Sequence, residues 1–352
     1  MKKLNFNFNI NFKIIIFTFS TLVFFYLLYL SIPSLYNSGR VQKVLSEELL
    51  SEFDLNISLS SNISYRILPA PHFVTKDSKL FNIKSKVNNE LGEIKDLKIY
   101  IKQNNFFKKN NISVSEIVID KANFYFKKDD LVFIKKYLNN FTSSKNISIK
   151  NRKLFLNDKN NNTVFIKSIK NFKLFYLTND NKNFAKMNGE IFKIPFSLLF
   201  EKNFNSKNKN LKIKFKKLPI RYNNESFFKE NKYTYKNNLY IMNSKLNSEY
   251  TIENNKIFLN SQKSIIRNTP ISYEGEINFK PFFVDLNINA KEFDMKYFFK
   301  KSFWLNELIS SKIFQNENFN AQIFINSDKL IKNKFFKKIS LHVNIEEGNL
   351  NL

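Results

Sequence analysis

Apolar and polar residues alternate at every second position along most of the chain. The alternation begins in 55–59 (LNISL) and 63–67 (ISYRI) and returns in 94–101 and 112–119. A period of two puts neighbouring side chains on opposite faces of a β-strand. It continues at 124–126, 147–149, 154–156, 164–166, 172–176, 191–196, 211–215, 257–259, 271–273, 277–279, 284–288, 319–325 and 339–343. The pattern predicts a mainly β fold, an elongated antiparallel sheet with one apolar face and a few short helices.

The N-terminal segment 14–32 reads IIIFTFSTLVFFYLLYLSI and carries no charge. At 1.5 Å per residue a helix of this length is roughly 28 Å long and matches the hydrocarbon core of a bilayer. Lys2, Lys3 and Lys13 precede it, so the positive-inside rule places the N-terminus in the cytoplasm and the bulk of the chain outside. A cleaved signal peptide would have a shorter apolar stretch and an A-x-A-like cleavage site after it. The segment that follows the apolar stretch here, SIPSLYNSG, has no such site. An uncleaved transmembrane anchor is therefore predicted.

Three further segments have a helical period. In 38–53, Val41, Leu45, Leu49 and Phe53 recur at helical spacing, which predicts an amphipathic helix that packs on the end of the sheet. A second helix is expected at 129–141 after an acidic start, and a third at 293–308.

The predicted organisation has four parts. Residues 1–13 are the cytoplasmic N-terminus, 14–32 the transmembrane anchor, 38–53 the amphipathic helix and 54–352 one β-rich domain. A cut near 203–210 is conceivable, but the alternation is alike on both sides of it. The final GNLNL follows a strand pattern and suggests a truncated member of something longer.

Composition adds a basic charge. Lys and Arg number 57 against 30 Asp and Glu, a net charge of +27. Such a balance is typical of nucleic-acid or anionic-membrane binding. The abundance of Lys, Asn, Ile and Phe, whose codons are rich in A and T, is the simpler explanation, and no nucleic-acid partner is expected.

Candidate chemistry is sparse. The chain has no cysteine, which excludes disulfides and thiolate chemistry, and its only histidines are His72 and His342. Neither histidine has metal-site spacing, and His72, after the rigid Pro69-Ala70-Pro71 break, is expected at the surface. The adjacent pairs 47–48 and 346–347 are poor acid and base partners, because neighbouring side chains point to different faces. We predict no enzyme activity, no metal and no cofactor.

The order of anchor, amphipathic helix, two strands, Pro-x-Pro and strand pairs resembles the N-terminal region of AsmA-like proteins of Gram-negative bacteria. The segments that carry the likeness are 41–73 (VQKVLSEELLSEFDLNISLSSNISYRILPAPHF), 92–102 (GEIKDLKIYIK) and 112–126 (ISVSEIVIDKANFYF). The last contains a step of strand, turn, small residue and strand at Asp120, Lys121 and Ala122. The chain departs from the family where Phe53 and Asp54 replace the usual Gly, and in its shorter C-terminal region.

The resemblance implies a bacterial inner-membrane protein whose periplasmic sheet curls into a groove, similar to bridge-like lipid transfer proteins. The implied partners are phospholipid, the inner membrane and outer-membrane or envelope proteins, with a role in lipid transport or outer-membrane assembly.

The candidate functional residues are inward apolar side chains that would line such a groove. An alternating pattern cannot distinguish a lipid-lined groove from a dry core, so two hypotheses stand: a lipid-binding protein, and an assembly factor with a closed core that acts through protein partners. The candidates are Ile63, Tyr65, Ile67, Leu97, Ile99, Ile117, Ile119, Phe124 and Phe126.

Overall fold

The computed structural model shows a mostly β protein, which confirms the predicted fold class. The chain forms two compact units, Met1–Leu177 (unit 1) and Thr178–Leu352 (unit 2), which we describe separately. The structure describes residues 12–82, 90–104, 106–107, 112–157, 163–191, 194–267, 269–279, 281–292, 294, 319–331, 337–347 and 349–351.

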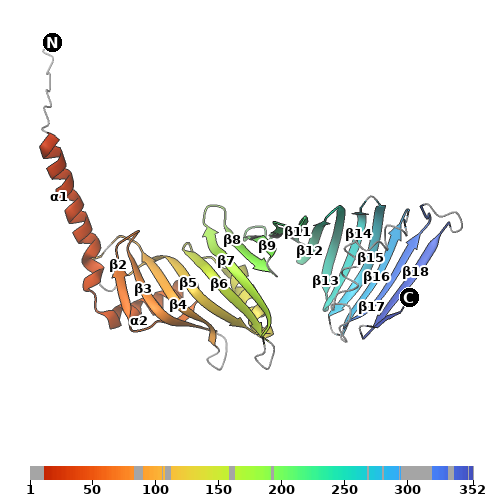
Figure 1. The fold of residues 1–352 in the computed structure, drawn as a ribbon, viewed down its shortest axis with the longest axis horizontal. Coiled ribbons are helices and arrows are strands. Elements are labelled where there is room, and N and C mark those ends of the chain that lie inside the picture. Colours follow the sequence, from red (N-terminus) through yellow and green to blue (C-terminus); the bar gives the residue numbers. More distant parts are fainter. Residues whose placement is uncertain are drawn as a thin grey trace, which may run out of the picture. The chain divides into compact units, whose positions relative to one another are not determined.

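Unit 1 begins with the apolar helix α1 (Phe12–Ser31), followed by the short 3-10 helix η1 (Ile32–Leu35). Figure 1 shows α1 projecting from the sheet of this unit. Within Lys13–Leu35 only 6% of the most apolar window is buried against the rest of the chain. The segment is long and apolar enough to cross a membrane, as predicted.

Helix α2 (Ser38–Phe53) has the predicted bounds. It begins at Asn37, whose side chain accepts a hydrogen bond from the backbone N–H of Arg40. It ends at Asp54, whose left-handed backbone (φ 52°) stops the helix. The stripe of Val41, Leu45, Leu49 and Phe53 is buried, so the helical period did identify the packed face of α2.

The strands of unit 1 form one sheet, in which β2 to β5 pair antiparallel in sequence order and β1 also pairs with β3. Helix α3 (Lys128–Asn140), which confirms the second predicted helix, connects β5 to a parallel β6, and β7 then pairs antiparallel with β6. The strands are β1 (Asn56–Ser58), β2 (Ile63–Arg66), β3 (His72–Phe81), β4 (Glu90–Ile101), β5 (Val114–Phe126), β6 (Asn146–Asn157) and β7 (Thr163–Leu177).

The turn expected at Asp120, Lys121 and Ala122 is wrong, because β5 runs through it without a break. Lys121 takes a left-handed backbone (φ 59°), and Asn151 does the same (φ 53°) on the neighbouring β6. The registered pairs of the two strands skip both residues. A local irregularity of this kind bends a strand and re-aims side chains without ending it.

Every described element of unit 2 is a strand, and consecutive strands from β8 to β19 pair antiparallel, except that β16 and β17 pair in parallel. The predicted helix at 293–308 lies outside the described residues apart from Asp294. The strands are β8 (Lys182–Ile191), β9 (Ile194–Asn203), β10 (Lys209–Phe215), β11 (Ile220–Lys229), β12 (Lys232–Ile241), β13 (Ser244–Glu253), β14 (Lys256–Ile266), β15 (Thr269–Phe279), β16 (Phe282–Ala290), β17 (Asn320–Ser327), β18 (Ile339–Glu346) and β19 (Asn349–Asn351).

Asparagine takes the place of glycine at tight turns of unit 2. The β11–β12 turn has Glu230 and Asn231 at φ 49° and 60°, and the β13–β14 turn has Asn254 and Asn255 at 48° and 64°. Two consecutive residues with positive φ are typical of the type I′ hairpin, whose twist matches that of the flanking strands. The segment 203–210, considered above as a boundary, contains the β9–β10 turn inside unit 2.

Candidate functional site

The sheet register of unit 1 places most of the predicted groove residues on one face. Leu97 pairs with Ile119, and Ile99 pairs with Ile117. Tyr65 joins the same face through Phe73, which pairs with both Tyr65 and Ile99. The two-residue period therefore assigned these side chains to a common face of unit 1.

That face is closed for most of its area. The side chains on the opposite face of β4 are exposed or half-buried, so the buried stripe of α2 must cover the Leu97 face. The predicted residues that are buried there are Leu97, Ile99, Ile117, Ile119, Phe124 and Phe126, whereas Ile63, Tyr65 and Ile67 are half-buried. In unit 1 this geometry is that of a packed core.

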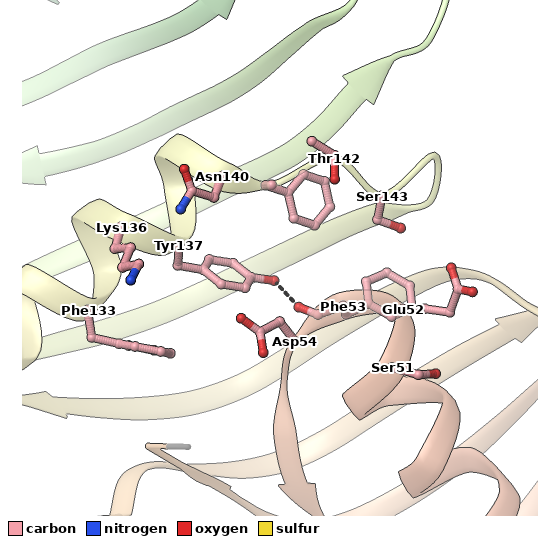
Figure 2. Close-up of a pocket in the computed structure, with 11 residues that line it drawn as sticks. Ser51, Glu52, Phe53, Asp54, Phe133, Lys136, Tyr137, Asn140, Thr142 and Ser143 are labelled. Atoms are coloured by element: carbon pink, nitrogen blue, oxygen red, sulfur yellow. Dashed lines mark hydrogen bonds between the residues drawn. The ribbon is translucent and has the colours of Figure 1, made fainter. Parts of the chain in front are cut away.

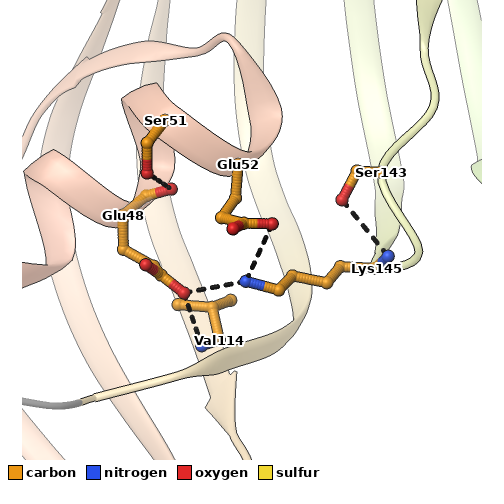
Figure 3. Close-up of polar contacts among 6 residues, drawn as sticks. All are labelled: Glu48, Ser51, Glu52, Val114, Ser143 and Lys145. Carbon is orange, nitrogen blue, oxygen red and sulfur yellow. Dashed lines mark hydrogen bonds and ion pairs between the residues drawn. The ribbon is translucent and has the colours of Figure 1, made fainter.

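A buried lysine fixes α2 in this position. Lys145, just before β6, lies 2.7 Å from Glu48 and 3.2 Å from Glu52, both on α2 (Figure 3). Glu48 also accepts a hydrogen bond from the backbone N–H of Val114 at the start of β5. The Lys145 side chain is only 8% exposed, whereas Glu48 and Glu52 are 23% and 44% exposed, so the cation is buried and its carboxylate partners reach solvent. The contacts join α2 to the strands below it.

A small pocket opens where the C-terminal end of α2 meets α3. Its volume is about 200 Å³, less than the roughly 300 Å³ at which small-molecule sites usually begin. Tyr137 of α3 donates a hydrogen bond to the Phe53 carbonyl oxygen across it, and Asp54 and Lys136 line it (Figure 2). The pocket is polar and too small for an acyl chain with its headgroup, so it does not qualify as a lipid site.

The sheet of unit 2 also has an apolar face, but its arrangement differs from that of unit 1. Its register forms continuous cross-strand rows of apolar side chains, and these rows define the apolar face of unit 2. One row joins Leu198, Ile213, Tyr222, Leu239 and Leu246, all of them half-buried. A second row joins Ile252, Ile257, Ile277, Val284, Ala321 and Ile345. Within the described residues of unit 2 no helix covers this face.

The other face of the same strands is polar. Lys236 pairs with Glu249 at 2.8 Å and Lys256 with Glu276 at 3.1 Å, and these ion pairs between neighbouring strands mark the polar face of unit 2. A sheet that is apolar on one side and charged on the other needs a partner for its apolar side.

The apolar face carries tyrosines and lysines beside the β9–β10 and β11–β12 turns. The rings of Tyr235 and Tyr250 stack with centroids 4.7 Å apart. Lys207 lies 4.5 Å from the ring centre of Phe228, and Lys209 lies 5.0 Å from that of Tyr233. Cationic groups therefore border the aromatic part of the apolar face. Sequence reasoning did not identify this group, because Asn and Ser interrupt the alternation in β11 to β13.

His72 is buried, which corrects its expected surface position. It starts β3, where its ring is stacked on Tyr100 at 4.8 Å and its Nδ1 atom lies 2.7 Å from the carbonyl oxygen of Ala70. Among the described residues no three His, Asp or Glu side chains come together as a cation site would need. The buried imidazole is therefore a structural group.

Acid should destabilise unit 1 through His72. Burial lowers the pKa of His72 below 6.5. The contact with the Ala70 carbonyl oxygen raises this pKa in part, and the nearby cations Lys98 and Arg66 lower it further. The unfolded chain then binds the proton more tightly, so stability falls as pH drops below about 6.5. We expect the denaturant midpoint to fall between pH 7 and pH 5, and to fall less in His72→Phe; an equal fall in both proteins would contradict this assignment.

No protein-family model matches the sequence, and no curated protein matches it. The class is therefore defined by the structure alone: among its described residues, the chain has one helix able to span a membrane, at the N-terminus, followed by a large, mainly antiparallel β-sheet. The apolar face of unit 2 is its best candidate for a functional surface.

Proposed function

We propose that this protein is anchored in a bacterial inner membrane and binds phospholipid in the periplasm on the apolar face of unit 2, in the manner of AsmA-like proteins. The observation that carries the proposal is the segregation of the strands of unit 2 into an apolar face and a polar, ion-paired face. The apolar face is half-buried along the row from β9 to β13 and buried at Ala321 and Ile345 of β17 and β18.

Acyl chains suit this surface. Burial of each methylene group is worth about 0.8 kcal/mol, and a row of aliphatic side chains supplies contact without the polar partners that an acyl chain cannot use. A protein partner would usually add hydrogen bonds along a strand edge, whereas the apolar face of unit 2 offers side chains alone.

The lysines supply the other half of a phospholipid site. Lys207 and Lys209 lie beside Phe228 and Tyr233 at the border of the apolar face, where a phosphate could remain in water next to a cation. The acyl chains would then lie along the aliphatic rows. The mechanism is binding or conduction by burial, and it needs no covalent chemistry.

Two double variants test the proposal with matched exposure. Ile252 (47% exposed) and Phe279 (46%) lie on the apolar face, whereas Phe258 (43%) and Ile265 (41%) lie on the polar face. We expect Ile252→Asp with Phe279→Asp to lower the bound phospholipid at least about tenfold, because charges then interrupt the apolar rows. Phe258→Asp with Ile265→Asp should leave binding unchanged. The measurement is native mass spectrometry of the detergent-extracted chain.

Two results would contradict the proposal. Equal lipid loss in both double variants would mean that the effect is not specific to the apolar face. A wild-type protein that carries no phospholipid, and that crosslinks to envelope proteins instead, would favour the assembly factor with a closed core. Unit 1, whose apolar face α2 covers, already has such a core.

A further inference from the structure

The last turns of α1 are attached to the connection between β4 and β5. Tyr26 donates a hydrogen bond of 2.8 Å to the side-chain oxygen of Gln103, and Tyr29 donates one of 2.7 Å to the Gln103 carbonyl oxygen. The Tyr29 ring also stacks on Phe106 with centroids 5.2 Å apart. These contacts fix the height of the connection along α1.

That height lies within the segment able to cross a membrane. Tyr26 and Tyr29 both belong to Lys13–Leu35. Tyr29, which bonds the Gln103 backbone, is six residues before Leu35, roughly 10 Å along the helix axis. If α1 crosses a bilayer, Gln103 and its neighbours must therefore lie at the depth of the lipid interface, into which peripheral apolar groups sink by about 5–10 Å.

The exposed side chains near Gln103 are of the kinds found at a lipid interface. Phe107 is 76% exposed although it lies beside Tyr29, with ring centroids 5.7 Å apart. Leu68, in the connection from β2 to β3, is 77% exposed at the same end of the sheet, where the Ile101 N–H donates to Pro71. Lys102 is exposed beside them. Aromatic and basic side chains together are typical of a membrane interface.

We propose that Phe107 inserts into the interface of the bilayer that α1 crosses, and that Leu68 and Lys102 contact the same lipid surface. The partner is a phospholipid bilayer, with anionic headgroups next to Lys102. The insertion would hold the end of the unit 1 sheet against the membrane instead of leaving it on a free tether. This inference depends on the membrane anchoring in the proposed function, but not on lipid binding by unit 2.

Tryptophan fluorescence quenched by brominated phospholipids tests the insertion. The sequence has one tryptophan, Trp304, so Trp304→Phe gives a background without indole fluorescence. Into it we would place Phe107→Trp, Phe24→Trp within α1, or Val132→Trp on α3, all at exposed positions (76%, 62% and 69%). Val132 serves as the distant control. Helix α3 contacts the C-terminal end of α2, whereas the N-terminal end of α2 follows α1, and the two ends of α2 are about 22 Å apart. The full-length chain is reconstituted into nanodiscs of phosphatidylcholine and phosphatidylglycerol.

The three positions give distinguishable results. We expect bromines near the headgroups to quench Phe107→Trp strongly, bromines deeper in the chains to quench Phe24→Trp, and neither to quench Val132→Trp. Quenching of Phe24→Trp without Phe107→Trp would overturn the insertion and leave the anchoring intact. Loss of quenching at both positions would overturn the anchoring itself, and equal quenching at Phe107 and Val132 would show that contact with lipid is not specific to this loop.

Discussion

Ile99→Asp is expected to unfold unit 1. Ile99 is fully buried near the C-terminal end of β4, between Phe73 and Ile117 on the neighbouring strands. The side chains of its direct partners, Phe73 and Ile117, offer a carboxylate neither a cation nor a hydrogen-bond donor, so the new group must either stay charged in an apolar core or bind a proton. Either outcome costs several kcal/mol, a large share of the roughly 5–15 kcal/mol by which domains are stable. Circular dichroism during urea denaturation and limited proteolysis would measure the loss.

Val132→Asp is the matched control. Val132 is 69% exposed on α3, so the same new charge should change the free energy of unfolding by less than about 0.5 kcal/mol. If Ile99→Asp folded normally and instead lost bound phospholipid, the core interpretation of unit 1 would be wrong and its apolar face would be part of a lipid groove.

Elements with a long and regular period were predictable from the sequence. The stripe from Val41 to Phe53 gave the bounds of α2, and the segment after Asp129 gave α3, because a period of 3.6 over three or more turns is hard to mistake. The apolar helix α1 was equally clear. In β4 and β5 the alternation also predicted which side chains share a face.

The burial of that face was not predictable. Alternation shows that Leu97 and Ile117 point the same way, but not that a helix covers them, since coverage depends on contacts far apart in the sequence. Strands β3, β8 and β11 to β13 were missed. In β11 to β13, Asn224, Asn237 and Ser248 lie on the apolar face and interrupt the apolar pattern. Asn224 donates a hydrogen bond to the Tyr250 hydroxyl at 2.7 Å. Polar groups can occupy a strand interior when they find such partners.

The irregularities at Lys121 of β5 and Asn151 of β6 explain why a turn was expected at 120–122 and a continuous strand is observed. Left-handed Lys121 and Asn151 resemble turn residues in the sequence, but parallel pairing on both sides of them keeps the strands continuous. Next to them the Arg152 side chain is completely buried and lies 2.8 Å from Asp120. The two residues are 32 positions apart in the sequence. Their pairing is a tertiary contact, which local sequence patterns do not reveal.

Asp120→Asn is expected to destabilise unit 1 by about 2–3 kcal/mol. Burial lowers the pKa of Arg152 to about 10, although Asp120 and Asp96 raise it, so the guanidinium is charged at neutral pH and already desolvated. Its Nη2 atom donates to Asp120 and to the Ile119 carbonyl oxygen at 2.7 Å. Breaking a buried pair usually costs about 3–5 kcal/mol, and we expect less because the Asp120 side chain is 30% exposed. Urea denaturation of wild type and variant at pH 7 would measure the difference.

The double variant Asp120→Asn with Arg152→Met separates charge burial from packing. Methionine fills much of the arginine volume without a charge, and replacing a buried ion pair by apolar groups is often neutral. We therefore expect the double variant to recover most of the stability that Asp120→Asn loses, although the Ile119 carbonyl oxygen gives up its arginine donor. If the double variant were less stable than the single one, the arginine would be stabilising β5 and β6 through its backbone hydrogen bonds, and the carboxylate would matter little.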